Sequence, residues 1–533
     1  MQLTVKTASS LEKILPSNKE FTEVEHGYIL KNSHFAFQMT IESDERKIIK
    51  MSVCSELNKY LTLYRVENRP LDYTGEGVVP DVLQPIDSFE FPVRAGAGIT
   101  TILFDFNIPK NAIAGDYSVK TVFSLYEEPF DVISKLETPV TVIDKILPES
   151  KIKSTLWFHT DCIASAHEVE IYSEEHWALI DKYMKLYSDI GMNMILTPVI
   201  TPPLDTAVGI RRPCVQLVQI EKKGKKYYFD FSLLDRWFSL CKKHKIKYFE
   251  IAHMFSQWGI KCAPNIRVKE KGVTDFKFGW HVASNAPEYK EFLEQFIPAL
   301  VEYLKAKKLY SKCYFHISDE PHGEEHLRNY KYASSVVRPL LKGAKFFDAI
   351  SDIEFFKTKQ INIPVVHISS MPKFIEYEME ERWTYYCCTV HESANRFLTI
   401  PAYRNRVLGT IMYKHDIEGF LQWGFNFYYS QFSRYEINPY LNSSAGRGFP
   451  EGDSFLVYPT AKNVHPSLRA IVFKDALQDI TLFKMLEGYI GKDAVIKLIE
   501  DEAGAPISFF DYPHENDFYI RLTDKIKKML AEM

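Results

Sequence analysis

The spacing of hydrophobic and polar positions changes near residue 150. Before that point, short apolar runs are separated by turns rich in Gly, Pro, Asn and Asp, which predicts an all-β sandwich. The strands expected there are residues 35–41, 48–53, 89–93, 100–106, 117–125 and 139–143. Residues 147–150 read Leu-Pro-Glu-Ser, which is typical of a linker. We therefore expect an N-terminal β-sandwich domain over residues 1–147.

From about residue 154, strand-like and helical patterns alternate, which predicts parallel βα units. The eight expected strands are residues 156–159, 192–197, 248–254, 313–317, 345–349, 365–368, 384–388 and 420–425. One intervening helix follows from the helical spacing of Trp177, Ile180, Met184 and Tyr187, and Gly191 ends it. The predicted fold class is α/β: a (β/α)8 TIM barrel over residues 151–490, preceded by the sandwich.

Several segments fall outside this simple repeat. Residues 215–221 and 226–231 flank Gly224 and predict a β-hairpin insertion. Residues 429–458 form a long polar stretch rich in Gly and Asn, and loops of that length are usually functional or disordered. The chain from about Ser467 is predicted to be helical, with a C-terminal helical extension over residues 491–533.

Composition narrows the class of protein. The chain is 46% hydrophobic and 25% charged with a net charge of -4, which gives no electrostatic case for binding nucleic acid or an anionic membrane. No apolar run approaches about 20 residues, and the first residues lack the pattern of a signal peptide. The eight cysteines form no Cys-x-x-Cys pair and no metal-like cluster with histidine. We expect a cytoplasmic protein with reduced thiols, no metal and no cofactor.

Two adjacent carboxylates, Asp319 and Glu320, follow the fourth predicted barrel strand and precede Pro321. Neighbouring side chains of a strand point to opposite faces, so both acids can serve one site only where the strand has ended. Chemistry in such barrels gathers at the carboxyl ends of the strands, and cleavage of a glycosidic bond needs carboxyl groups there. The alternative is that the acids only decorate the N-terminus of a helix beginning near Glu324.

The ends of the other predicted strands carry aromatic, carboxylate and hydrogen-bonding side chains that suit a neutral polyhydroxylated ligand. The candidate substrate-binding residues at these ends are Asp161, Glu250, His253, Trp258, Tyr386, Trp423 and Asn426. Each also has a structural interpretation. The acids and the histidine could be satisfied core residues, and the aromatic rings could fill the mouth of the barrel.

A set of ordered motifs resembles the family called domain of unknown function 4091, which is related to glycoside hydrolase family 123. The motifs are Trp157-Phe158-His159-Thr160-Asp161, Leu196-Thr197-Pro198, Phe249-Glu250-Ile251-Ala252-His253, Gln257-Trp258-Gly259, His316-Ile317-Ser318-Asp319-Glu320-Pro321, Trp383-Thr384-Tyr385-Tyr386-Cys387, Gly419-Phe420-Leu421-Gln422-Trp423-Gly424 and Gly452-Asp453-Ser454-Phe455-Leu456-Val457-Tyr458-Pro459. The resemblance covers about residues 150–490.

Characterised members of glycoside hydrolase family 123 are β-N-acetylgalactosaminidases that retain anomeric configuration by substrate assistance. The resemblance implies that Glu320 is the general acid/base. It implies that Asp319 orients and polarises the 2-acetamido group of the substrate, whose oxygen attacks C1. It also implies that Trp423, Tyr386 and Trp258 form walls of the sugar pocket.

Polar neighbours are expected to hold the sugar hydroxyls, and the resemblance nominates Asp161, Asn426 and His316. Glu451 and Asp453 of the long loop are a further hypothesis for the leaving-group side. The implied partner is a carbohydrate, either a small oligosaccharide or a glycoconjugate. Many relatives of the characterised enzymes are secreted, whereas this sequence shows no export signal.

Two other functions remain open from the sequence. A glycosidase with two separated carboxylates would use Glu320 as the acid and Glu250 or Asp161 as the nucleophile, on sugars that lack the 2-acetamido group. A non-catalytic carbohydrate-binding barrel would keep the pocket without the reaction. Cys387 and Cys388 could include a reactive thiol, but strand-end core cysteines are the simpler interpretation.

Overall fold

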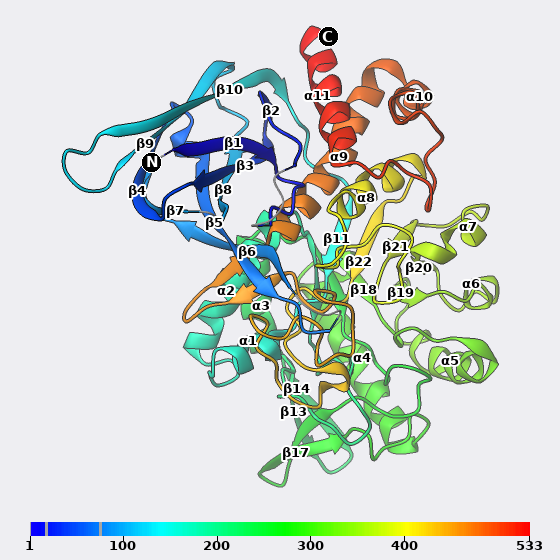
Figure 1. The fold of residues 1–533 in the computed structure, drawn as a ribbon. Helices are drawn as coiled ribbons and strands as arrows, with labels where there is room; N and C mark the ends of the chain where they lie inside the picture. Colours follow the sequence, from blue (N-terminus) through cyan, green and yellow to red (C-terminus); the bar gives the residue numbers. More distant parts are fainter. Residues whose placement is uncertain (1, 16–19, 74–76, 97) are drawn as a thin grey trace.

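The computed structural model describes residues 2–15, 20–73, 77–96 and 98–533. The chain begins with two five-stranded sheets, drawn in blue and cyan in Figure 1. The first, in spatial order, contains β1 (Leu3–Ser9), β3 (Ser33–Ser43), β8 (Thr100–Ile108), β5 (Leu61–Pro70) and β6 (Val78–Ile86). The second contains β2 (Gly27–Lys31), β10 (Val132–Ile146), β9 (Gly115–Leu125), β4 (Lys47–Cys54) and β7 (Glu90–Ala95).

The two sheets bury one hydrophobic cluster between them. Phe37 and Met39 of β3 meet Ile49 and Met51 of β4 in that cluster, because alternate residues of each strand face inward. All six strands predicted in this region are present. Four others, β1, β2, β5 and β6, were not predicted.

Eight parallel strands then form a nearly closed barrel. In spatial order they are β11 (Lys153–Leu156), β22 (Gly419–Gln422), β21 (Trp383–Tyr385), β20 (Ile363–His367), β19 (Lys345–Ile350), β18 (Cys313–Phe315), β15 (Tyr248–Ile251) and β12 (Met194–Thr197). The seam between β11 and β12 is bridged by the hydroxyl of Tyr187, which lies within hydrogen-bonding distance of the Leu156 carbonyl (2.8 Å) and the Met194 carbonyl (2.7 Å).

Helices follow the barrel strands in alternation, although two of them are single turns. The helices from β11 onward are α1 (Thr160–Ala166), α2 (Glu174–Asp189), α3 (Ser232–Lys243), α4 (Pro287–Ala306), α5 (Gly323–Val337), α6 (Glu354–Lys357), α7 (Met371–Phe374), α8 (Tyr403–Lys414) and α9 (Leu468–Ile490). The four-residue α6 and α7 leave the barrel only partly flanked by helices on that side. Short 3₁₀ helices lie at Asn58–Tyr60, Tyr310–Lys312, Ile368–Ser370 and Gln431–Ser433.

The predicted order of the eight barrel strands is correct, but their ends are displaced. The first was expected at residues 156–159 and lies at Lys153–Leu156, and the eighth was expected at 420–425 and ends at Gln422. The apolar pattern continues past both strands because the chain that leaves the sheet is still buried, as Trp157 and Phe425 are. Burial alone therefore does not mark where a strand stops.

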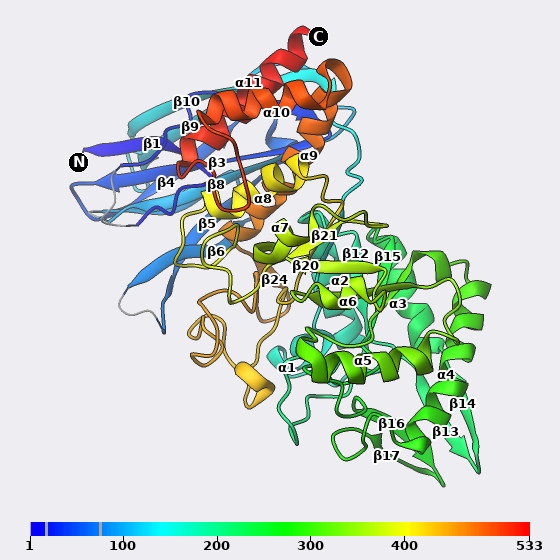
Figure 2. The ribbon, with the colours of Figure 1, turned by 90° about the vertical axis from the view of Figure 1, so that its right-hand side faces the viewer.

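Two insertions extend one side of the barrel, at the bottom of Figures 1 and 2. The predicted hairpin is present as β13 (Gln219–Lys223) and β14 (Lys226–Asp230). A second, unpredicted hairpin, β16 (Ile266–Glu270) and β17 (Val273–Phe278), joins it in a four-stranded sheet. A smaller pair, β23 (Val457–Pro459) and β24 (Val464–Pro466), follows the long loop.

The C-terminal helices connect the barrel to the two N-terminal sheets. Figure 2 shows α9, α10 (Lys492–Ala503) and α11 (Asn516–Glu532) beside those sheets. Arg469 of α9 binds Asp81 of β6 (2.9 Å), and His34 of β3 binds Asp475 of α9 (2.8 Å), all buried. The predicted division at residues 147, 151 and 490 stays a prediction. Within the described ranges, no helix has the length and apolar character needed to cross a membrane.

Candidate active site

The adjacent acids Asp319 and Glu320 lie just beyond the carboxyl end of β18, where the chain has left the sheet. Glu320 has a φ of 42°, a left-handed conformation that is uncommon for a residue with a side chain. Because the backbone is no longer extended, the two carboxylates are released from strand alternation. Both line one cavity of about 360 Å³.

The cavity is formed by the loops at the carboxyl ends of the barrel strands, the usual position of barrel chemistry. Its described lining residues are Trp157, Leu204, Asp205, Gln257, Trp258, Asp319, Glu320, Ala349, Tyr385, Cys387, Cys388, Leu421, Trp423, Gln431, Phe432 and Phe449. Aromatic rings and few polar groups make up this wall, which is the composition of a site for a small ligand with an apolar face. The long loop 429–458 contributes Gln431, Phe432 and Phe449, so it forms part of the cavity.

Burial controls the protonation of the acid pair. Burial raises the pKa of Asp319 well above its usual value, and the neighbouring Glu320 raises it further. Burial also raises the pKa of Glu320, and a hydrogen bond of 2.6 Å from the Tyr385 hydroxyl opposes that shift. A carboxyl group with a raised pKa can hold a proton near neutral pH, which a general acid requires.

His316, three residues before Asp319, is held between two carboxylates. Its Nε2 lies 3.1 Å from Glu250 and its Nδ1 lies 3.0 Å from Asp348, and all three side chains are fully buried. Burial lowers the pKa of His316, but the bonds to Asp348 and Glu250 outweigh it and raise the pKa to about 9. The imidazolium favours the charged form of Asp319 in return, so it counteracts part of the effect of burial there.

Four lining residues other than glycine have left-handed backbone conformations. They are Asp205 (φ 38°), Trp258 (φ 52°), Glu320 (φ 42°) and Phe432 (φ 63°). Such conformations cost about 1–3 kcal/mol each, and they gather where a site must hold its side chains in one arrangement. Their convergence on this cavity is an observation independent of the acids.

Two predicted aromatic walls lie at the cavity. The Trp258 side chain is 38% exposed and packs edge-on against Phe432. Trp423 is held by a 3.0 Å hydrogen bond from its Nε1 to Asp453 and by packing against Phe449. Their contact with a sugar remains a prediction.

The structure corrects the position of Tyr386. Its side chain is fully buried against Phe420 on the other face of the chain, and within the described residues its hydroxyl has no hydrogen-bond partner. Tyr385 is the tyrosine that reaches the cavity and binds Glu320. Adjacent residues of a strand face opposite sides, so an error of one position reversed the prediction.

The polar residues expected to hold hydroxyls lie outside the lining of the cavity. Asp161 pairs with Arg212 at 3.0 Å. Asn426 uses its side-chain amide to bind both backbone groups of His159, at 2.9 and 3.0 Å. These contacts fix the first turn after β11 and leave neither group facing the cavity.

Glu250, His253 and His316 also lie beneath the cavity rather than on its wall. Glu250 accepts hydrogen bonds from Thr155, from Trp157 Nε1 and from His316. His253 stacks on His316 with ring centroids 4.0 Å apart, and burial holds its pKa well below the usual value. Of the three, His316 acts on the acid pair, through the effect of its charge on Asp319.

The loop acids proposed for the leaving-group side are also buried away from the cavity. Glu451 is fully buried and accepts a hydrogen bond from the backbone of Tyr73. Asp453 binds Trp423 and Gln422, and burial raises its pKa to about 7. Asp453 orients the aromatic wall and does not line the cavity.

Tyr385 and Gln257 lie in the quoted motifs, but the candidate site residues included only their neighbours Tyr386 and Trp258. Asp205 was not predicted. Asp205 lies in an irregular loop after β12, where no periodic pattern indicates which side chain faces inward. The pair Cys387 and Cys388 lines the cavity, and the neighbouring thiol together with burial raises the pKa of Cys387, which disfavours the reactive thiolate.

Two buried groups of the described residues have the side-chain types of a metal site. One is His159, Asp161 and Cys162, and the other is His253, His316 and Asp348. Asp161 is paired with Arg212, and both ring nitrogens of His316 are engaged by carboxylates. Neither group lines the cavity.

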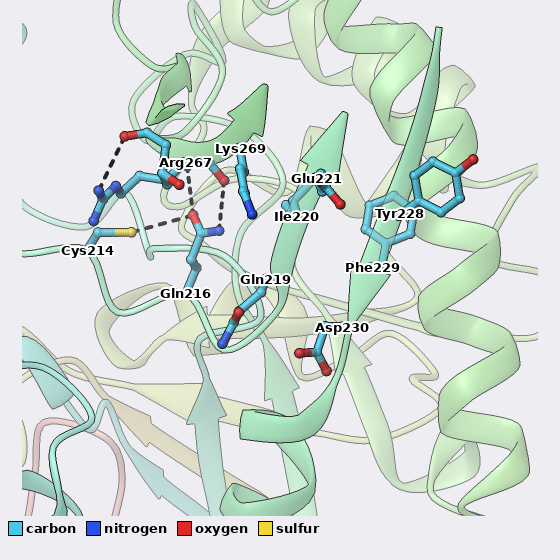
Figure 3. A pocket seen from close by; sticks show the side chains of 11 residues that line it. Cys214, Gln216, Gln219, Ile220, Glu221, Tyr228, Phe229, Asp230, Arg267 and Lys269 are labelled. Atoms are coloured by element: carbon cyan, nitrogen blue, oxygen red, sulfur yellow. Dashed lines mark hydrogen bonds between the residues drawn. The ribbon is translucent and has the colours of Figure 1, made fainter. Parts of the chain in front are cut away.

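A second groove, of about 480 Å³, lies on the four-stranded insertion sheet (Figure 3). Gln216 at its edge is held by Arg267, whose backbone N–H donates to Oε1 (2.7 Å) and whose carbonyl accepts from Nε2 (2.9 Å). Its acids, Glu221 and Asp230, lie on β13 and β14, and the groove holds no adjacent buried acid pair. The smaller cavity at the barrel is therefore the candidate active site.

A parallel barrel with a buried acid pair in a cavity at its carboxyl end has the architecture of a barrel glycoside hydrolase. Comparison with protein-family models agrees, because that of the glycoside hydrolase 123 catalytic domain matches residues 157–486. The chain belongs to glycoside hydrolase family 123. A comparison with curated protein sequences gives no match.

One of the solved structures compared with this chain has the same fold. A family 123 glycoside hydrolase from Clostridium perfringens, studied for glycolipid glycan hydrolysis, has a TM-score of 0.76 and 14% identity, covering 100% of this chain and 98% of that chain. A β-glucuronidase from Bifidobacterium dentium has a TM-score of 0.34 and 10% identity, covering 89% of this chain and 67% of that chain. The first extends the likeness across the N-terminal sheets as well as the barrel.

Proposed function

We propose that this protein is a retaining glycoside hydrolase that removes terminal β-linked N-acetylhexosamine, of the GalNAc type, by substrate-assisted catalysis. The observation that carries the proposal is the adjacent pair Asp319 and Glu320, both buried with raised pKa values in one cavity. Family membership supports the reaction class.

The proposed reaction begins with one proton shared by the acid pair, because two adjacent carboxylates resist joint ionisation, and with that proton on Glu320 the carboxylate of Asp319 is ionised. The Glu320 proton passes to the glycosidic oxygen as the C1–O bond breaks, and the acetamido oxygen of the substrate bonds to C1. Asp319 accepts the acetamido N–H and stabilises the positive charge of the resulting oxazoline-type intermediate. Water then attacks C1, Glu320 takes its proton, and the acetamido group is released. No cofactor enters these steps.

Two consecutive acids suit this assignment better than a two-carboxylate mechanism. An enzyme nucleophile would lie about 5–5.5 Å from the acid across the scissile bond. The earlier candidates for that role, Glu250 and Asp161, do not line the cavity. Of the described residues, Asp205 is the other carboxylate that does, and burial raises its pKa to about 6.

The substrate we propose is a small oligosaccharide or the glycan of a glycoconjugate. The Clostridium perfringens relative is described with glycolipid glycans, so a glycolipid head group belongs among the compounds to test. We further propose that the protein acts in the cytoplasm, because its eight cysteines are unpaired, as is usual in a reducing compartment.

The first test is turnover of aryl β-glycosides of GalNAc, GlcNAc, galactose and glucose, with and without a thiazoline analogue of the acetamido sugar. We expect turnover of the 2-acetamido substrates alone, and inhibition by the thiazoline. Turnover of galactosides or glucosides would move the nucleophile to an enzyme carboxylate. Sugar binding without turnover would favour a non-catalytic barrel.

The roles of the two acids can be separated by leaving group. Glu320→Gln should lower kcat/KM by about 10²–10⁴-fold for a natural leaving group, and much less for an activated aryl group that needs no proton. Asp319→Asn should be poor with both, because it acts on the acetamido group. Equal losses of Glu320→Gln on both substrates would contradict the division of roles.

A further inference from the structure

Beside the acid pair, the cavity wall carries the carboxylate of Asp205, and one of its two oxygens accepts a hydrogen bond from the protein. Asp205 Oδ2 accepts a 2.9 Å hydrogen bond from the backbone N–H of Phe432. Among the described residues, its other oxygen, Oδ1, has no hydrogen-bond partner. The side chain is 8% exposed, and it lines the cavity. Because Oδ1 belongs to a largely buried carboxylate that lines the cavity, an incoming ligand is one source of a donor for it.

Gln257, next to Asp205, presents the complementary group. Its Oε1 accepts a 2.6 Å hydrogen bond from the backbone N–H of Asp205. Because an amide oxygen must face that N–H, the other end of the side chain is the nitrogen, Nε2. This Nε2 is buried without a partner in the described part of the chain, and the residue is 5% exposed on the cavity wall.

The position of this pair relative to the acids is fixed by the backbone. Trp258, the residue after Gln257, donates its N–H to the carbonyl of Asp319 at 3.3 Å. The carboxylate of Asp205 also acts electrostatically on that of Asp319. Asp205 and Gln257 therefore lie on the Asp319 side of the cavity, beside the sugar atoms that Asp319 contacts.

We propose that Asp205 and Gln257 form a hydroxyl clamp, in which Asp205 Oδ1 accepts from one hydroxyl of the terminal sugar and Gln257 Nε2 donates to the next. The inference rests on the proposed function, because that function places the C2 acetamido group at Asp319. The ring carbon beyond C2 is C3, followed by C4, so the clamp binds the hydroxyls on C3 and C4.

This assignment makes the two residues determinants of specificity. A carboxylate and an amide that close on O3 and O4 leave no room for another sugar at either position. The enzyme is then restricted to a terminal residue with both hydroxyls free, which is exo action. A site built to bind a hydroxyl also discriminates strongly against an analogue that lacks it, because its own polar groups are left unpaired.

The test compares Asp205→Asn with the wild type on an aryl β-glycoside and on its 3-deoxy and 4-deoxy analogues. Asparagine keeps an oxygen for the Phe432 N–H and loses only the charge and the free acceptor. We expect kcat/KM for the parent sugar to fall about 10- to 100-fold, as for loss of a hydrogen bond to a charged group. On the analogue that lacks the bound hydroxyl, kcat/KM of the variant should be within about twofold of the wild-type value.

Gln257→Glu provides a second variant, because its carboxylate still accepts from the Asp205 N–H while the free donor is removed. Any effect of the added charge on Asp319 acts on every sugar alike, so the difference between parent and deoxy sugars isolates the hydroxyl. Asp230→Asn makes the same carboxylate-to-amide change in the groove of Figure 3 and should leave all the ratios unchanged. Thermal melting checks that each variant is folded.

Failure of the clamp is distinct from failure of the proposed function. Equal losses on parent and deoxy sugars would overturn the clamp while the wild-type activity stands. A loss in kcat/KM of about 10⁴-fold or more on every sugar would mark Asp205 as a nucleophile, and this outcome would also overturn the clamp. If the wild type hydrolyses only glycosides that lack the 2-acetamido group, the acetamido mechanism is contradicted. The deoxy comparison is then made with those glycosides. A wild type that neither binds nor hydrolyses these sugars contradicts both.

Discussion

At the scale of the residue, the hydrogen bond between Tyr385 and Glu320 sets the working pH of the proposed acid. Burial raises the pKa of Glu320, and the Tyr385 hydroxyl lowers it. Tyr385→Phe removes the opposing effect, so the alkaline limb of the kcat/KM profile should move to higher pH. We also expect kcat/KM at the optimum to fall about tenfold, as one hydrogen bond to a carboxylate is lost.

Tyr386→Phe is the matched control for that measurement, since its hydroxyl has no partner among the described residues and lies off the cavity. Its pH profile should match that of the wild type. An unshifted profile in Tyr385→Phe would mean that the alkaline limb belongs to a group other than Glu320.

The raised pKa of Asp319 makes a separate prediction about stability. Between the pKa near 3.9 of an unfolded aspartate and the higher folded value, the folded state holds more protons than the unfolded state. Stability is therefore lost as pH rises through that window. Asp319→Asn removes the loss, so it should raise the melting temperature at pH 7, by about 1–2 kcal/mol of stability, and give no gain below about pH 3.

The pKa of Glu381, in the same barrel, is shifted in the direction opposite to that of Asp319. Burial raises the pKa of Glu381, but Lys153 and Lys345 outweigh it and lower the pKa to about 2. Glu381→Gln should lower the free energy of unfolding at pH 7. This difference from the wild type should disappear as the pH falls through about 2. Melting curves of both variants from about pH 2 to about pH 8 check the two signs, and parallel curves would refute the account of burial.

The acid pair was predictable from sequence because a carboxylate doublet at a strand end is a local pattern. The face on which Tyr385 lies was not predictable, because it depends on the register of the strand. A shift by one residue changes the face and leaves the composition of the segment unchanged. Asp205 illustrates a second limit, since a loop residue reaches the cavity through a left-handed φ of 38° that no apolar period encodes.

At the scale of the element, the seam between β11 and β12 is bridged by Tyr187 of α2 and by Asn193, whose side-chain oxygen accepts the Ser154 N–H (3.1 Å). The Tyr187 hydroxyl accepts the Leu156 N–H (3.0 Å) and faces the carbonyls of Leu156 and Met194, so it replaces direct pairing of β11 with β12. Tyr187→Phe leaves a buried N–H unpaired, which costs about 1–3 kcal/mol. The melting temperature should fall, and amide exchange at β11 and β12 should accelerate.

Tyr183→Phe, one turn earlier on α2, removes a hydroxyl that contacts the side chain of His167. It should change exchange at the barrel seam little, although the volume removed is the same. Similar exchange in the two variants would mean that the seam is held by packing rather than by the Tyr187 hydroxyl.

The elements themselves were mostly predictable, since all eight barrel strands appear in the expected order. The strands that were missed carry weaker patterns. β5 contains Arg65, Glu67, Asn68 and Arg69 within ten residues, and it is paired on both sides by β6 and β8 rather than marked by its own apolar period. Pairing across the sheet outweighs local preference in such strands.

At the scale of the whole molecule, the N-terminal region reaches the cavity through the long loop 429–458. The Asp72 carboxylate, which follows β5, accepts hydrogen bonds from the N–H of Ser443 (3.0 Å), its hydroxyl (2.8 Å) and the Ser444 hydroxyl (2.9 Å). The Ser444 carbonyl in turn accepts the N–H of Phe449, which lines the cavity. Contacts between residues about 370 positions apart are outside the reach of local sequence patterns.

This chain of contacts predicts that the N-terminal region supports catalysis by ordering the loop. Asp72→Ala should lower the free energy of local opening of residues 443–452 by about 2 kcal/mol, seen as faster amide exchange. KM should rise several-fold with little change in kcat, because the Phe449 wall is less ordered while Asp319 and Glu320 are untouched. Asp116→Ala removes a carboxylate that binds Thr141 in the second sheet and should leave both measurements unchanged. Unaltered exchange in Asp72→Ala would place the order of the loop in its packing against Trp423.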